Sequence, residues 1–133
     1  MKALDTNVLA RYLVEDDRAQ SERAATLIDG ALDRGEALFV PQLVLAELVW
    51  VLGRAYDFRR PEIADLLRHL IHARQLVIED VDDVHRALDA YTKGKADFAD
   101  YLIRERTRRA GCEGIFTFDR RLLDEEGLSA GPP

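Results

Sequence analysis

The chain has 133 residues, of which 47% are hydrophobic and 33% charged, and its formal net charge is −6. This length and composition predict one globular domain and exclude a disordered chain. The single cysteine, Cys112, excludes an internal disulfide and a cysteine-based zinc site. Residues 37–53 form the most apolar stretch, but Pro41 and Glu47 interrupt it, and it is too short and too polar to span a membrane.

Short apolar runs alternate with amphipathic segments along the chain. The runs predict brief buried strands, here 2–4, 37–40, 76–78 and 115–118. The segments between them predict seven helices. Helices are expected over 8–13, 43–56, 61–71 (starting at Pro61) and 84–91. A further helix is capped by Asp16 or Asp17 and ends at Gly35, another runs from 98 to Gly111, and a short last helix is opened by Asp119. We expect residues 127–133, rich in Gly and Pro, to be a frayed tail.

This alternation is typical of an α/β fold, in which helices cover both faces of a small, mainly parallel sheet. Ligands of such sheets bind beyond the carboxyl ends of the strands. Asp5 directly follows the first strand and Asp119 the last, so both are expected at that edge. Each also has a purely structural interpretation, because aspartate is a favoured helix N-cap and both precede a predicted helix.

Glu47 interrupts the most apolar helix, which is hydrophobic nearly all round. We expect its carboxylate to be buried, and therefore paired with an arginine, protonated, or bound to a metal ion. Asp97 and Asp100 are three residues apart, a spacing that places both on one face of a helix. Asp97 can also be a helix cap with Asp100 in the first turn, where the helix dipole favours negative charge.

Several carboxylates in one cleft need a compensating cation. Mg²⁺ and Mn²⁺ prefer oxygen ligands, and sites of this kind serve phosphoryl transfer. The candidates are thus Asp5 and Asp119 at strand ends, Glu47 within a helix and Asp100 at a helix start, with Asp97 as a fifth.

In these residues the sequence resembles the PIN-domain ribonucleases, specifically VapC-like toxins of type II toxin–antitoxin pairs. The resemblance spans residues 2–123 and rests on the order and spacing of four segments: Leu4-Asp5-Thr6-Asn7, Leu45-Ala46-Glu47-Leu48, Asp100-Tyr101-Leu102-Ile103 and Thr117-Phe118-Asp119-Arg120. It implies a three-layer α/β/α sandwich over the single domain 1–133. It also implies a cytoplasmic endoribonuclease that uses Mg²⁺ or Mn²⁺, forms a homodimer and is inhibited by a small antitoxin protein.

The same resemblance assigns roles to individual residues. Asp5, Glu47 and Asp100 would hold the principal metal, and Asp119 would complete the site. Asp97 would be a further ligand or a group that hydrogen-bonds one. Asn7 and Thr117 would orient carboxylates. The implied reaction leaves a 5′-phosphate and a 3′-hydroxyl. The chain departs from the family where Arg104 and Glu105 stand in place of small residues.

The acidic net charge conceals an uneven distribution. Residues 93–121 contain eight Lys and Arg against five Asp and Glu, a balance of 8 − 5 = +3, so the remainder carries −9. We therefore expect arginines of this segment to contact RNA phosphates, with candidates Arg104, Arg108, Arg109 and Arg120.

Three other functions remain as alternatives. A haloacid-dehalogenase-like phosphatase also has an aspartate after its first strand, but it needs a second acid where Asn7 stands. A receiver-like signalling domain has an acidic metal site but needs adjacent acids and a late lysine. A binding module with a dead site would not be expected to keep all four acids.

Overall fold

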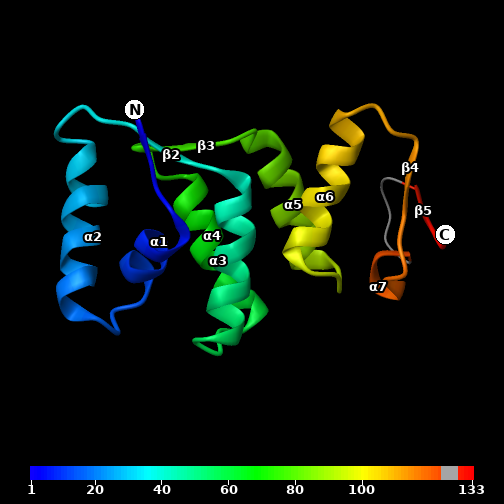
Figure 1. Ribbon diagram of the computed structural model, residues 1–133, viewed down its shortest axis with the longest axis horizontal. Helices are drawn as coiled ribbons and strands as arrows, with labels where there is room; N and C mark the ends of the chain where they lie inside the picture. The colour runs from blue at the N-terminus through cyan, green and yellow to red at the C-terminus, as the bar shows by residue number, and fades with distance from the viewer. Residues whose placement is uncertain (124–128) are drawn as a thin grey trace. The chain divides into compact units, whose positions relative to one another are not determined.

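The computed structural model describes residues 1–123 and 129–133, and it divides the chain into two compact units (Figure 1). The first unit is Met1–Val81 and the second is Asp82–Pro133. Within the described residues, no helix is long and apolar enough to cross a membrane.

The first unit contains a three-stranded parallel sheet and four helices. The strands are β1 (Lys2–Ala3), β2 (Leu38–Val40) and β3 (Leu76–Ile78), with β2 in the centre. Lys2 pairs with Leu38, and Leu38 with Leu76. The helices are α1 (Thr6–Leu13), α2 (Arg18–Ala31), α3 (Gln42–Arg54) and α4 (Arg60–Ile71).

Local signals in the sequence explain where these helices begin and end. Asp17 caps α2 by accepting a hydrogen bond from Gln20 N at 3.1 Å. In α4, which has proline in its first turn, Glu62 Oε1 accepts from Arg59 N at 3.1 Å. Gly35 follows α2 with a φ of 66°, a conformation that glycine adopts without a steric penalty.

The core of the first unit lies where its helices meet. Helix α1 packs against α2 and α3, and α4 packs against α3 and β3. Fully buried aliphatic side chains form this core, and they include Leu9, Ile28, Leu45, Leu48, Leu52 and Leu67. Burial of this kind contributes about 2 kcal/mol for each such side chain, which fixes the helices that carry Asp5 and Glu47.

The second unit contains α5 (Val81–Lys93), whose first residue belongs to the first unit, α6 (Phe98–Arg109), β4 (Gly114–Phe116), α7 (Arg120–Leu123) and β5 (Ser129–Gly131). Tyr91 of α5 and Phe98 of α6 meet edge to face, with ring centroids 5.8 Å apart. Tyr101 and Phe98 are fully buried. The short α7 follows β4 and carries the last arginines of the basic segment.

The end of the chain differs from the sequence prediction. Residues 129–131 form β5, which pairs in parallel with β4, and Thr117 N donates to Gly131 O at 2.9 Å. These backbone hydrogen bonds give part of the expected frayed tail a regular structure; residues 127 and 128 lie outside the described residues. The parallel strands alternating with helices confirm the predicted α/β class, with the strands distributed over a three-stranded and a two-stranded sheet.

Candidate functional site

Asp5 lies at the junction of β1 and α1, as the sequence predicted. It is the N-cap of α1, and its Oδ1 accepts a hydrogen bond from Val8 N at 3.1 Å. The side chain is exposed. The expected capping role is therefore present, but it uses one acceptor position of a carboxylate that has several. Capping and binding of a cation are compatible for this residue.

Glu47 is exposed, and the expectation that it is buried in an apolar environment is wrong. Helix α3 turns Leu45, Leu48 and Leu52 inward, but its outer face is also largely apolar. Leu43 is 71% exposed and Trp50 is 64% exposed on either side of Glu47 in sequence. Hydrophobic composition does not fix burial, because apolar residues also occupy protein surfaces, and this is why the pattern misled.

Thr6 connects the first two predicted acids. Its Oγ1 donates a hydrogen bond to Glu47 Oε2 at 3.1 Å. Thr6 is buried and directly follows Asp5, and α1 packs against α3. Asn7, to which the family resemblance assigns the orientation of carboxylates, lies exposed on α1. The only sequence signal for Thr6 was its place beside Asp5.

In the second unit, Asp97 and Asp100 form a capping box at the start of α6. Asp97 N donates to Asp100 Oδ2 at 3.1 Å. Asp97 is exposed and Asp100 half-buried. Burial raises the pKa of the Asp100 carboxyl; the hydrogen bond from Asp97 N opposes this, and the nearby charges of Asp119 and Asp97 add to it. The capping interpretation is thus correct for Asp97, while Asp100 holds its charge at an energetic cost.

Asp119 lies in the turn between β4 and α7, where Thr117 and Arg121 hold it. Its backbone N–H donates to Thr117 Oγ1 at 3.0 Å, so Thr117 shapes the turn. Its Oδ1 accepts from Arg121 N at 2.9 Å and Arg121 Nε at 3.1 Å, and its Oδ2 accepts from Arg121 Nη2 at 2.9 Å. The Arg121 guanidinium lowers the pKa of the Asp119 carboxyl, and Asp119 in turn raises the pKa of Arg121.

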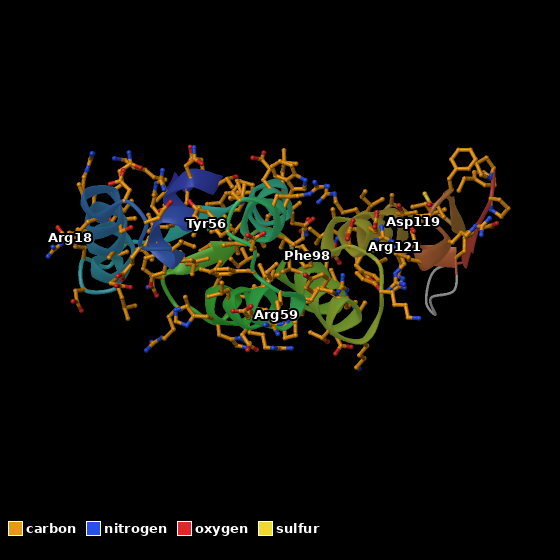
Figure 2. The ribbon with its side chains drawn as sticks, turned by 90° about the horizontal axis from the view of Figure 1, so that it is seen from below. Arg18, Tyr56, Arg59, Phe98, Asp119 and Arg121 are labelled. Carbon is orange, nitrogen blue, oxygen red and sulfur yellow. The ribbon has the colours of Figure 1, made fainter. Side chains whose placement is uncertain are left out.

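Arg121 also reaches Asp97. Its Nη1 and Nη2 lie 3.5 Å from Asp97 Oδ1 and Oδ2, respectively. Figure 2 shows the Asp119 and Arg121 side chains next to each other. One guanidinium therefore joins the start of α6 to the turn before α7. Arg121 was not among the predicted site residues; the sequence signal for it is its position two residues after Asp119 at the start of a helix.

Most of the arginines expected to contact RNA are engaged within the second unit. Arg104 is buried and its guanidinium lies 5.0 Å from the Tyr101 ring centroid. Arg108 Nη1 donates to Glu105 Oε2 at 3.1 Å. Arg109 donates to both oxygens of the buried Asp83, at 2.7 and 3.1 Å. Arg120 is exposed at the start of α7. Sequence patterning identified the positive segment but not the acids that its arginines contact.

The donor chemistry of the predicted acids suits a hard divalent cation, since all are carboxylates. Their arrangement does not form a finished site: among residues 1–123 and 129–133, no three His, Cys, Asp or Glu side chains are grouped so that they could hold a metal ion. In the second unit, the guanidinium of Arg121 contacts both Asp97 and Asp119.

Comparison with known proteins gives the family. The PIN domain family model matches residues 2–126, which is nearly the whole chain and includes parts of both units. The chain belongs to the PIN domain family, and its PIN-like α/β fold, predicted from the sequence, is confirmed.

Two individual proteins are similar to it. A VapC ribonuclease of Aquifex aeolicus is 28% identical over 121 residues, which are 91% of this chain and 89% of the relative. The crystal structure of VapC20 of Mycobacterium tuberculosis, a toxin that cleaves the sarcin–ricin loop, has 17% sequence identity and a TM-score of 0.46 over 90% of this chain and 91% of that one.

Proposed function

We propose that the protein is an endoribonuclease of the VapC type, acting as the toxin of a toxin–antitoxin pair. The observation that carries this proposal is the PIN domain match over residues 2–126. The similarity to a VapC ribonuclease over 91% of the chain supports the narrower class. The matching sequence segments contain Asp5, Glu47, Asp100 and Asp119 in the order expected of such an enzyme.

The reaction we propose depends on Mg²⁺ or Mn²⁺ bound by carboxylates. Asp5, Glu47, Asp100 and Asp119 would be ligands, and Asp97 a ligand or a group that orients one. A bound divalent cation activates water and stabilises the charge that develops on a phosphodiester. This proposal is supported by the donor chemistry, by the exposure of Asp5 and Glu47, and by the partial burial of the Asp100 carboxylate, which disfavours an uncompensated charge there.

The chain's own side chains would prepare these ligands. Thr6 holds one oxygen of Glu47 and leaves the other open to a ligand. The hydrogen bond from Asp97 N fixes one oxygen of Asp100. Arg120, exposed beside Asp119, is the candidate that we retain for contact with RNA phosphates. Cleavage would leave a 5′-phosphate and a 3′-hydroxyl.

The partners proposed are an RNA substrate, a cognate antitoxin protein and a second copy of the chain, with the cytoplasm as the compartment. The class of RNA is left to experiment. Sequencing the ends of cellular RNA after controlled expression identifies the substrate, and size-exclusion chromatography with light scattering measures the oligomeric state.

The decisive experiment compares purified wild type with Asp5→Asn and Asp100→Asn on a labelled RNA, with Mg²⁺, with Mn²⁺ and with a chelator. We expect cleavage that both substitutions and the chelator reduce by at least about a hundredfold. Asp89→Asn is the matched control, because Asp89 is an exposed aspartate that forms an ion pair with Lys93 in the same helix.

Undiminished cleavage by either site variant would refute the assignment. Hydrolysis of a small phosphomonoester, lost in Asp5→Asn, would favour the phosphatase alternative. Stable labelling of the protein by a phosphodonor would favour the receiver alternative.

A further inference from the structure

Arg121 is held more tightly than an exposed arginine at a helix start usually is. It makes three hydrogen bonds with Asp119, one from its backbone and two from its guanidinium, and it faces both oxygens of Asp97. Its side chain remains 48% exposed, so burial does not force this arrangement. Complementary charge and the planar fork of the guanidinium account for it.

The two carboxylates that share Arg121 come from different elements. Asp97 caps α6, whereas Asp119 precedes α7, and the guanidinium is the cation that the structure places between them. Asp100 adds a third negative charge nearby, since its Oδ2 accepts a hydrogen bond from Asp97 N at 3.1 Å. A single arginine thus neutralises part of a cluster that would otherwise repel itself.

From this geometry we infer that Arg121 is an internal counter-ion that competes with a divalent cation for Asp97 and Asp119. The inference rests on the proposed metal-dependent function. A cation that binds Asp119 has to share the oxygens that now accept from Arg121 Nε and Nη2, and the neighbouring guanidinium repels it. The free energy spent in weakening these hydrogen bonds and in bringing two positive charges together is subtracted from the affinity for the metal.

The competition sets a threshold concentration of metal ion. With Arg121 in place, the charges of Asp97 and Asp119 are partly neutralised without metal, which stabilises the apo protein. Metal occupancy then begins at a higher metal concentration than the carboxylates alone would require. Arg121 is accordingly a positioning and regulatory residue, because in this role it acts on the ligands and does not touch the reacting atoms.

Isothermal titration calorimetry with Mn²⁺ tests the competition without any RNA. Arg121→Gln removes the charge, and we expect Mn²⁺ to bind about fivefold more tightly than to wild type. Arg121→Lys keeps the charge but loses the fork, so its affinity should be intermediate. Arg120→Gln makes the same charge change one residue away and should alter Mn²⁺ affinity by less than about twofold.

A second measurement follows the arginine itself. In a ¹H–¹⁵N spectrum of the apo protein, the Nε–H resonance that Arg121→Lys removes should be sharp, because Asp119 Oδ1 accepts from it. Addition of Mg²⁺, which is diamagnetic, should shift and broaden this resonance in parallel with binding. A resonance that does not respond to saturating Mg²⁺ would overturn the competition.

The outcomes separate this inference from the proposed function. Equal or weaker Mn²⁺ binding by Arg121→Gln, together with RNA cleavage by wild type, would overturn the counter-ion role and leave the ribonuclease proposal standing. If neither wild type nor Arg121→Gln bound Mn²⁺, the competition would be overturned as well. RNA cleavage in the presence of chelator would then show that the reaction does not depend on a metal. Tighter binding by Arg121→Gln with Arg120→Gln unchanged supports the inference.

Discussion

The hydroxyl of Thr6 donates to Glu47 Oε2 across 3.1 Å, and this bond joins two residues that are 41 positions apart in the sequence. Thr6 is buried at the start of α1, whereas Glu47 lies on the exposed face of α3. A buried donor thus fixes one oxygen of an exposed carboxylate. An exposed glutamate otherwise samples several rotamers, so the contact reduces the entropy that a ligand of Glu47 would have to overcome.

Thr6→Val removes this donor while keeping a β-branched side chain of the same shape. We expect RNA cleavage to fall about tenfold, because an outer hydrogen bond of this kind tunes a ligand without replacing it. Thr6→Ser keeps the hydroxyl and should stay within about threefold of wild type. Cleavage rates measured over a range of Mn²⁺ concentrations provide the test, and the loss in Thr6→Val should be partly recovered at high Mn²⁺.

A structural role alone would give another result. If Thr6→Val lowered both the urea unfolding midpoint and the cleavage rate, and high Mn²⁺ did not restore cleavage, then Thr6 would stabilise the packing of the helices and would not orient Glu47. The free energy of unfolding in urea distinguishes the two cases for the same preparations.

The pair of Asp83 and Arg109 predicts a stability effect. Asp83 has a side chain that is only 4% exposed, and Arg109 donates to both its oxygens, while Arg86 lies further away at 3.4 Å. Arg109→Gln leaves a buried carboxylate with a weaker partner, and we expect the free energy of unfolding to fall by about 1–2 kcal/mol. Urea denaturation measures it, and Lys93→Gln, from an exposed ion pair, should change it by less than about 0.5 kcal/mol.

This pair also limits how RNA binding can be tested. Replacing Arg109 with glutamate would place a second negative charge beside the buried Asp83, and lost affinity would then reflect altered folding. Arg120→Gln avoids the problem, because Arg120 is exposed. If Arg120 contacts phosphate, this variant should weaken RNA binding in the absence of metal and reduce its salt dependence by about one counterion. Unchanged salt dependence would exclude Arg120 as a phosphate contact.

Asp100 predicts a pH-dependent stability of the apo protein. Burial raises its pKa above the ordinary 3.8, so the folded state favours the protonated carboxyl. The ionised form therefore destabilises the folded state at neutral pH, and this penalty disappears as the pH falls below the unfolded-state value. Asp100→Asn removes the charge and can keep the acceptor for Asp97 N. Without metal, we expect the variant to melt about 1–2 °C higher near neutral pH.

The comparison of melting temperatures at several pH values provides the check. The advantage of Asp100→Asn should shrink towards zero at the acidic end and should reverse when saturating Mn²⁺ is present, since the metal stabilises only the protein that can bind it. An advantage that is constant with pH would show that the charge of Asp100 is not its cause.

The sequence predicts features that depend on neighbouring residues better than contacts between residues far apart in the chain. Local signals were sufficient for most elements but not for β5: Asp17 starts α2, Gly111 follows α6, and Asp5 and Asp119 lie after strands. The contacts of Thr6 with Glu47 and of Arg109 with Asp83 connect residues 41 and 26 positions apart, and no periodicity reports such pairs. The exposure of Glu47 was mispredicted because an apolar helix can show apolar residues to solvent.

Tyr12 and Asp29 tie α1 to α2 and predict stability at alkaline pH. The Tyr12 hydroxyl donates to Asp29 Oδ1, and burial together with this carboxylate raises the pKa of Tyr12 to about 12. Because the folded-state pKa lies above the ordinary 10.0, the contribution of this hydrogen bond to the free energy of unfolding is complete below about pH 10 and is lost as the pH rises towards 12.

At about pH 8, Tyr12→Phe should lower the free energy of unfolding by about 0.5–1 kcal/mol, the value for a partly exposed hydrogen bond to a charged group. Urea unfolding at increasing pH should show the difference between the two proteins vanishing above pH 10. Asp29→Asn retains a neutral acceptor, and absorbance titration should then find Tyr12 ionising at lower pH than in wild type; an unchanged titration would mean that burial alone sets its pKa.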